Sequence, residues 1–211
     1  FATIKPNHGM AYVKIPCIDV EFKTQCMPRT GFCLNHMRFV PVDLMDVAGL
    51  VPGASEGKGL GNQFLSDLSQ ADCFIQVVDS SGGTTIEGKP CEPGTHDPCE
   101  DITFLENELD LWYLGILNKV WRTFARTLSV TKEAGGFERG VAKQFSGLKI
   151  DENMVKDVMR KTGLDSSKAP TWKEEELLKF ARALRILSKP MVIAANKCDF
   201  KESIENIKKM K

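Results

Sequence analysis

The fold of this chain is constrained most by short apolar runs that end in polar clusters. Residues 37–47 read MRFVPVDLMDV and lead into the cluster DVAG at residues 46–49. Residues 73–78 form a second run, and residues 191–195 form a third that is followed at once by the letters NKCD. Such runs are typical of parallel strands that are buried on both faces. The sequence therefore predicts an α/β domain with a largely parallel sheet.

A helical pattern separates the second and third apolar runs. Apolar residues recur there with a helical period, first over a stretch long enough for one long helix or a helical hairpin. Asp151 and Thr171 stand where two further amphipathic stretches begin, and we expect them to cap those helices. We therefore expect an α/β domain made of residues 1–100 and 190–211, interrupted by an all-helical insertion at residues 101–189.

The first polar cluster has the spacing of a phosphate and metal site. An aspartate at the carboxyl end of a strand, here Asp46, can hold Mg²⁺ through a water molecule. Three residues later, Gly49 lacks a side chain, so its backbone N–H can approach a γ-phosphate closely. D-x-x-G alone is a common turn sequence. Its position directly after an apolar strand is what favours the metal site.

The second polar cluster has the chemistry to recognise a purine base. The carboxylate of Asp199 can accept two hydrogen bonds from the N1 and N2 donors of guanine, which adenine does not offer. Asn196 and the stem of Lys197 would brace the base and the loop. Together with Asp46 and Gly49, these residues predict a site for GTP and Mg²⁺.

The two motifs and their surroundings resemble one protein family. The most specific segment is DVAGLVPGASEGKGLGNQFL at residues 46–65, and it is accompanied by FATIKPN at residues 1–7 and PMVIAANKCD at residues 190–199. On these segments nearly the whole chain resembles the GTPase domain of the Obg-related YchF family, particularly its archaeal-type branch. The resemblance implies a Ras-like P-loop NTPase core and a nucleotide switch that hydrolyses GTP slowly.

The resemblance also implies roles for two further residues. Thr3 would be the switch I threonine that closes on Mg²⁺ and the γ-phosphate, with Asp46 as the other metal-binding residue. Leu50 would stand where Ras has its water-positioning glutamine, and a leucine cannot orient an attacking water molecule. Hydrolysis must then use another group, and no catalytic residue is assigned.

One motif that this fold requires is missing from the 211 residues. No G-x-x-x-x-G-K followed by Ser or Thr occurs, although the backbone amides and lysine of that loop hold the β-phosphate. The resemblance places the loop before Phe1 and a further domain after Lys211. The sequence is therefore interpreted as truncated at both ends, and we expect the 211-residue piece to be inactive by itself.

Two alternative functions remain open. Many members of the family carry glutamate in place of the final Asp of N-K-x-D and resemble ATP binders, so an ATPase of the same fold is one alternative, although Asp199 favours GTP. Leu50 and the missing loop also fit a non-catalytic docking module that uses the helical insertion. Related GTPases associate with ribosomes, which implies translation-linked work in the cytoplasm.

The charge balance and the cysteine spacing indicate which partners and which cellular compartment the sequence favours. Lys plus Arg and Asp plus Glu both number 28, so the formal net charge is zero and no general attraction to nucleic acid is indicated. Neither sequence-specific nucleic-acid binding nor a membrane-spanning segment is predicted. The seven cysteines are irregularly spaced, which argues against a disulfide framework and favours a reducing cytoplasm.

The same cysteines raise the question of a zinc site. No close C-x-x-C pair is present, and the spacings are unlike those of the usual structural zinc sites, so zinc is disfavoured. The sets considered are Cys17, Cys26, Cys33 and His36, and more weakly Cys91, His96 and Cys99.

Overall fold

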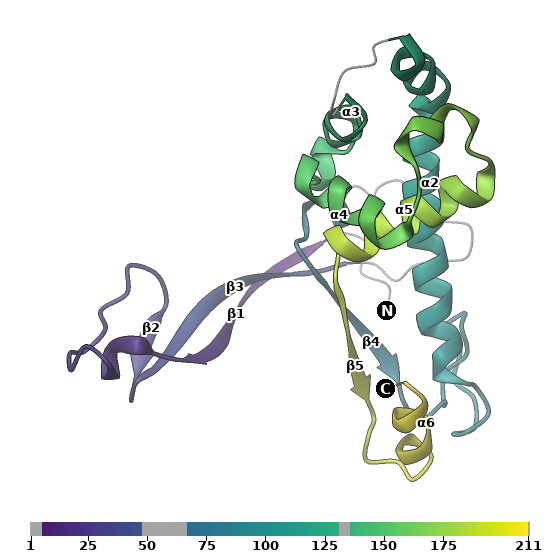
Figure 1. Ribbon diagram of the computed structural model, residues 1–211. Helices are drawn as coiled ribbons and strands as arrows, with labels where there is room; N and C mark the ends of the chain where they lie inside the picture. The colour runs from purple at the N-terminus through teal and green to yellow at the C-terminus, as the bar shows by residue number, and fades with distance from the viewer. Residues whose placement is uncertain (1–5, 48–66, 131–135, 211) are drawn as a thin grey trace. The chain divides into compact units, whose positions relative to one another are not determined.

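The computed structural model describes residues 6–47, 67–130 and 136–210. The chain divides into two compact units, Phe1–Gly49 and Leu50–Lys211. Helices accompany two small sheets, as Figure 1 shows, so the predicted α/β character is confirmed. The described strands do not form one largely parallel sheet, because three of them pair antiparallel within the first unit and only the other two run parallel.

The first unit is a three-stranded antiparallel sheet with the order β1-β3-β2. Strand β1 (Asn7–Pro16) pairs along its whole length with β3 (Met37–Asp46), from Asn7 opposite Asp46 to Pro16 opposite Met37. The connection between these two strands covers residues 17–36. The short strand β2 (Phe32–Leu34), which was not predicted, also pairs with β3.

A tight turn and one 3-10 turn organise the connection between β1 and β3. Asn35 and His36 link β2 to β3 and have φ angles of 49° and 59°. Two consecutive left-handed residues match the right-handed twist of a hairpin, and asparagine tolerates that conformation well. The 3-10 turn η1 covers Ile18–Val20 and includes Asp19, the one fully buried side chain among residues 6–47.

The second unit contains the parallel strands β4 (Phe74–Asp79) and β5 (Met191–Asn196). The expectation that such strands are buried on both faces is wrong for β4. Phe74 and Val78 are buried, whereas Ile75 and Val77 are 57% and 66% exposed. The buried face lies toward the long helix α2 (Pro98–Val130), since Gln76 donates a 2.9 Å hydrogen bond to the backbone oxygen of Asp101.

The described residues between β4 and β5 contain four α-helices. Helix α2 is a single helix of 33 residues rather than a hairpin. Helices α3 (Gly136–Gln144) and α5 (Glu174–Ser188) contact it, and α4 (Glu152–Thr162) packs against α3 and α5. The buried apolar cluster runs from Tyr113 to Leu184 and lies within these helices and their connections. None of the described helices combines the length and apolar character that crossing a membrane requires.

One of the two predicted helix caps is correct. Asp151 accepts a hydrogen bond from the Met154 N–H and caps α4, as predicted. Thr171 does not cap α5, because it ends the 3-10 turn η4 (Ser166–Thr171) and α5 begins three residues later. The carboxylate of Glu176 instead accepts the Lys173 N–H at 2.7 Å, which satisfies a donor at the helix start.

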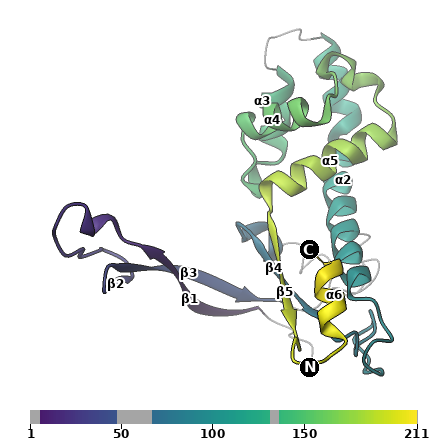
Figure 2. The same cartoon turned by 60° about the horizontal axis from the view of Figure 1, so that its bottom comes forward.

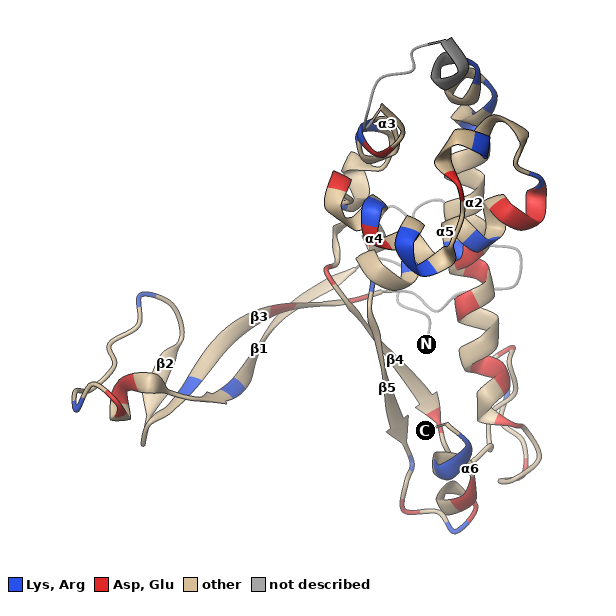
Figure 3. Cartoon of the chain, in the orientation of Figure 1, with Lys and Arg blue, Asp and Glu red and all other residues tan. Residues whose placement is uncertain are grey.

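The charged residues on the first half of α2 are acidic, as Figure 3 shows, whereas α4 and α5 carry residues of both signs. Two of the acidic residues, Glu106 and Asp110, form ion pairs with Arg185 of α5, whose side chain is only 3% exposed. The contact between α2 and α5 is therefore partly ionic in a region that is otherwise apolar.

Candidate functional site

The parallel strands β4 and β5 end side by side, and this end carries the candidate site (Figure 2). Asp79, the last residue of β4, lies opposite Asn196, the last residue of β5. Equivalent ends of parallel strands meet at one edge of the sheet, where ligands bind in open α/β folds. Of the predicted base-binding residues, Asn196 ends β5, and Lys197 and Asp199 lie in the turn between β5 and helix α6 (Ser203–Lys209).

This turn has a left-handed residue at its centre. Lys197 has a φ angle of 55°, and its backbone N–H donates to Asn196 Oδ1 at 2.9 Å. The Ser203 hydroxyl donates to the Lys197 carbonyl oxygen at 2.7 Å. Left-handed conformation costs a non-glycine residue about 1 kcal/mol or more, so such a turn persists only where neighbouring groups hold it. The hydrogen bonds around Lys197 supply that support.

The side chain of Lys197 is anchored on Asp79. Its Nζ lies 2.7 Å from Asp79 Oδ2, which also accepts the Thr84 hydroxyl at 2.6 Å. The other oxygen, Oδ1, accepts the hydroxyl of Ser81 at 2.6 Å and its backbone N–H at 3.1 Å. Burial acts to raise the pKa of Asp79, but the hydrogen bonds from Lys197, Ser81 and Thr84 outweigh it and hold that pKa well below its usual range.

A buried polar network lies beneath the same turn. The Ser80 hydroxyl donates to the Asn196 carbonyl oxygen at 2.5 Å, and Asn206 Nδ2 donates to the Ser80 carbonyl oxygen at 2.9 Å. Ser80 and Ser203 are fully buried, and Asn206 is nearly so. Because each of these groups has a partner, the network fixes β4, β5 and α6 relative to one another.

Sequence reasoning missed the residues that support the turn. Asp79 directly follows the second apolar run at residues 73–78, and its pairing with Lys197 spans 118 positions along the chain. Ser203 and Asn206 lie three residues apart on one face of α6, which is the one sequence signal that could have indicated them. Their partners, however, depend on the parallel register of β4 and β5.

Of the predicted phosphate and metal residues, the structure describes only Asp46. Asp46 is the last residue of β3 in the first unit, where it pairs with Asn7 and its side chain is exposed. Thr3, Gly49 and Leu50 lie outside the described residues. The structure therefore brings together Asn196, Lys197 and Asp199 of the predicted site.

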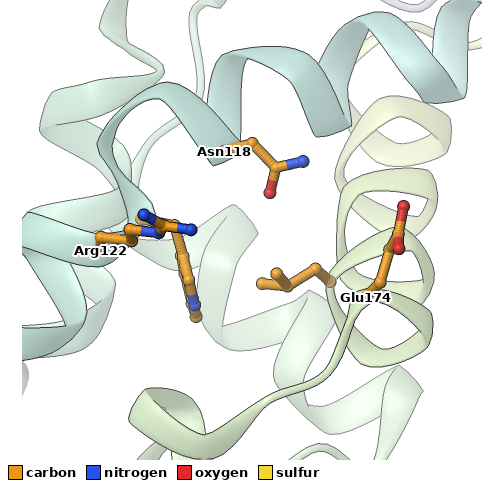
Figure 4. A pocket seen from close by; sticks show the side chains of 5 residues that line it. Asn118, Arg122 and Glu174 are labelled. Carbon is orange, nitrogen blue, oxygen red and sulfur yellow. The ribbon is translucent and has the colours of Figure 1, made fainter.

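A separate groove of about 590 Å³ lies between α2 and the start of α5 (Figure 4). Asn118, Trp121 and Arg122 contribute from α2, and Glu174 and Leu177 contribute from α5. Arg122 and Glu174 offer charges of opposite sign, but no residue predicted from the sequence lines this groove. It is therefore not part of the strand-end site.

The pairing of Asp79 with Lys197 makes stability depend on pH. Because the folded-state pKa of Asp79 is depressed, its ionised form stabilises the fold fully above the ordinary aspartate pKa of about 4. This contribution is lost as the pH falls through the lower folded-state value. We expect Asp79→Asn to lower the free energy of unfolding by about 1–2 kcal/mol at neutral pH, and the difference from the parent chain to shrink in acid.

Urea denaturation followed by tryptophan fluorescence, at neutral pH and at pH values below about 4, measures this effect. Asp199→Asn is the matched control, because Asp199 belongs to the same turn and its side chain is exposed. An Asp79→Asn variant as stable as this control at neutral pH would show that the anchor contributes nothing.

The chain is similar to known proteins of one family. No family model matches the chain. An uncharacterized GTP-binding protein of Methanocaldococcus jannaschii is 47% identical over all of this chain and 52% of its own length. The ribosome-binding ATPase YchF of Bacillus subtilis is 30% identical over 93% of this chain and 48% of its own length.

A solved structure agrees with these sequence relatives. The crystal structure of a GTP-binding protein from Pyrococcus horikoshii matches 97% of this chain and 54% of its own, with a TM-score of 0.80 and 35% identity. The chain thus spans about half the length of the relatives that it matches. The identity over the whole chain and the agreement in fold show that it belongs to the Obg-related YchF family of GTP-binding proteins.

Proposed function

We propose that the complete protein is a nucleotide switch that binds GTP with Mg²⁺ and hydrolyses it slowly, and that this chain supplies the base-binding turn. The observation that carries the proposal is the anchoring of residues 196–199 on Asp79 and on the buried network below. Such a turn holds its polar side chains in place before the ligand arrives, which reduces the entropic cost of binding.

The exposed groups of the turn fit guanine better than adenine. Asn196 Oδ1 is occupied by the Lys197 N–H, so its amide nitrogen is the group left to donate to a base oxygen or ring nitrogen. The exposed Asp199 carboxylate can accept the N1 and N2 hydrogens of guanine. Adenine offers an acceptor at N1 and no donor at C2, so it would leave the carboxylate without these hydrogen bonds.

The metal and the phosphates would be served by residues outside the base-binding turn. The exposed carboxylate of Asp46 at the end of β3 is the hard oxygen ligand that Mg²⁺ prefers. With Thr3 it would hold the ion, which neutralises phosphate charge when bound, and Gly49 would donate its backbone N–H to the γ-phosphate. Leu50 cannot position a water molecule, which is why slow hydrolysis is proposed.

The helical part is proposed to be an insertion at residues 101–189 in a GTPase domain made of residues 1–100 and 190–211. Its own buried cluster, from Tyr113 to Leu184, supports this division. Relatives are named as ribosome-binding ATPases. We propose that the complete protein likewise works with ribosomes in the cytoplasm, with the helical insertion as a contact surface.

Competition between GTP and ATP for the complete protein tests the proposed function. With Mg²⁺ present, a fluorescent GTP analogue should be displaced by GTP at concentrations at least ~10-fold below those needed with ATP, since each hydrogen bond to a charged group contributes about 1.5–3 kcal/mol. The 211-residue chain, measured in parallel, should bind more weakly. Asp199→Glu is the comparison variant, in which the preference for GTP over ATP should be smaller.

Each outcome of this competition has a definite meaning. Preference for ATP would replace the GTPase proposal with an ATPase of the same fold. Failure of the complete protein to bind either nucleotide would leave the non-catalytic docking module as the function. A single-turnover assay with bound GTP then measures hydrolysis, and a rate matching that of a fast GTPase would contradict the role given to Leu50.

A further inference from the structure

Three cysteine side chains converge in the first unit. Cys17 follows β1, Cys26 lies in the connection, and Cys33 lies in β2, yet their sulfur atoms all lie within 4.8 Å of one another. All three residues are partly buried. The irregular spacing of these cysteines disfavours zinc in the sequence. Their side chains nevertheless form a close cluster, because the connection folds back across β2.

A buried carboxylate lies against the thiols. Asp19 is only 3% exposed. Its Oδ2 accepts the Cys26 N–H at 3.0 Å and lies 3.7 Å from Cys33 Sγ, while its Oδ1 lies 3.0 Å from His36 Nδ1. A charged side chain is rarely buried unless it is paired or coordinates a metal. The arrangement places Asp19 as both a neighbour of the thiols and a partner of His36.

A basic side chain borders the cluster on another side. Arg38 donates to Cys26 Sγ at 3.7 Å and to the Thr30 carbonyl oxygen at 3.5 Å. A guanidinium beside a sulfur favours its thiolate form. The positive charges of Arg38 and one divalent ion would offset most of the negative charge of three thiolates and the Asp19 carboxylate.

The connection around the cluster has no apolar core of its own. Among residues 6–47 no apolar side chain is fully buried, and many are exposed, including Ile18, Phe22 and Met27. Between Cys17 and Gly31 the only regular element is the 3-10 turn η1. Long connections of this kind within a compact unit need another source of order, and small units commonly obtain it from a metal ion.

The three sulfur atoms lie close enough to share one tetrahedral ion, and the Asp19 carboxylate would have to move toward them to complete the site. Zinc bound at about 2.3 Å to sulfur and about 2.0 Å to oxygen requires S···S distances near 3.8 Å and S···O distances near 3.5 Å. The sulfurs lie within 4.8 Å of one another, and Cys33 Sγ is 3.7 Å from Asp19 Oδ2. Three thiols cannot all be joined in disulfides, whereas soft thiolates in this number suit Zn²⁺.

We propose that Cys17, Cys26 and Cys33 bind a structural Zn²⁺ ion, with Asp19 as the fourth ligand. His36 then orients the Asp19 carboxylate from outside the coordination sphere, in the way that such partners orient ligands in known metal sites. The ion fastens the long connection to the hairpin. None of these residues is among those proposed to bind the nucleotide or Mg²⁺.

Metal analysis of the purified chain, prepared with reduced thiols, tests the site. After dialysis the parent chain should retain one zinc ion per molecule, and Cys17→Ser, Cys26→Ser and Cys33→Ser should each lose it. Cys73→Ser is the matched control, because Cys73 is an exposed cysteine of the second unit and should leave the zinc content unchanged. Equal zinc content in all four variants would overturn the proposal.

Cobalt substitution of the parent chain gives a result that does not depend on how the variants fold. Co²⁺ should produce thiolate-to-metal charge-transfer absorption and the intense visible bands of a tetrahedral site, and Zn²⁺ should abolish both. A pale octahedral spectrum without charge transfer would overturn the proposal.

A comparison of two variants tests whether Asp19 is the fourth ligand. Asp19→Ala should lower zinc affinity more than His36→Gln, for which a loss of about 10–100-fold is expected from an orienting partner. Cobalt charge transfer should persist in both variants, since three thiolates remain. A larger loss in His36→Gln would overturn the choice of Asp19.

Discussion

Replacing Arg185 by alanine should lower the free energy of unfolding by about 3–5 kcal/mol, a large part of the ~5–15 kcal/mol of a typical domain. Arg185 is buried, with its Nε 2.8 Å from Asp110 Oδ1 and its Nη2 3.4 Å from Glu106 Oε1. Without Arg185, the buried Asp110 carboxylate loses much of the positive charge that offsets the cost of burying it. The expected cost comes mainly from that stranded charge.

Arg182 provides a matched control on the same helix. It also pairs with Asp110, at 3.3 Å, but its side chain is 54% exposed. Exposed ion pairs contribute about 1 kcal/mol or less, so Arg182→Ala should have a small effect. Urea denaturation followed by tryptophan fluorescence compares the two variants, and the slope should stay constant while the midpoint shifts.

A double variant separates the stranded charge from the lost packing. Arg185→Met combined with Asp110→Leu replaces both charged partners by apolar groups and should recover most of the stability lost in Arg185→Met alone. If the double variant is less stable than Arg185→Met, Asp110 is not a stranded charge in that single variant, because its pair with Arg182 still stabilises the protein. If Arg185→Ala lowers the free energy of unfolding no more than Arg182→Ala does, the buried ion pairs of Arg185 do not stabilise the contact between α2 and α5.

Much of the local structure could be predicted because it depends on local periodicity. The apolar runs that become β3, β4 and β5 were recognised from continuous hydrophobicity, and the apolar stripe predicted the long helix α2. Asp151 was found as a cap because its carboxylate serves the helix that directly follows it. Thr171 failed because a 3-10 turn intervenes, and that turn shares the same cap and start signals.

The rest depends on contacts that are distant along the chain. Lys197 reaches Asp79 only because β4 and β5 are parallel and in register, and no sequence pattern shows that register. Cys17, Cys26 and Cys33 meet because the connection folds back on β2, a short strand that the sequence did not indicate. Side-chain pairing across such distances follows from tertiary structure and leaves no local periodicity.

Replacing Asp199 by asparagine in the complete protein should change which base is bound. Asparagine keeps an acceptor and gains a donor at the position of the carboxylate. Guanine then meets one amide N–H₂ where its own N2 donor needs an acceptor, and GTP affinity should fall by about 100-fold or more, since hydrogen bonds to a charged group are lost. Xanthine carries an oxygen in place of that N2 group and should fit the amide.

The central claim, that the turn at residues 196–199 recognises guanine, is tested most directly by measuring GTP and XTP binding to the complete protein and to its Asp199→Asn variant, with Mg²⁺ present. The account predicts that the parent protein prefers GTP and that the variant prefers XTP. An Asp199→Asn variant that binds GTP as tightly as the parent would contradict it, because Asp199 would then not contact the base.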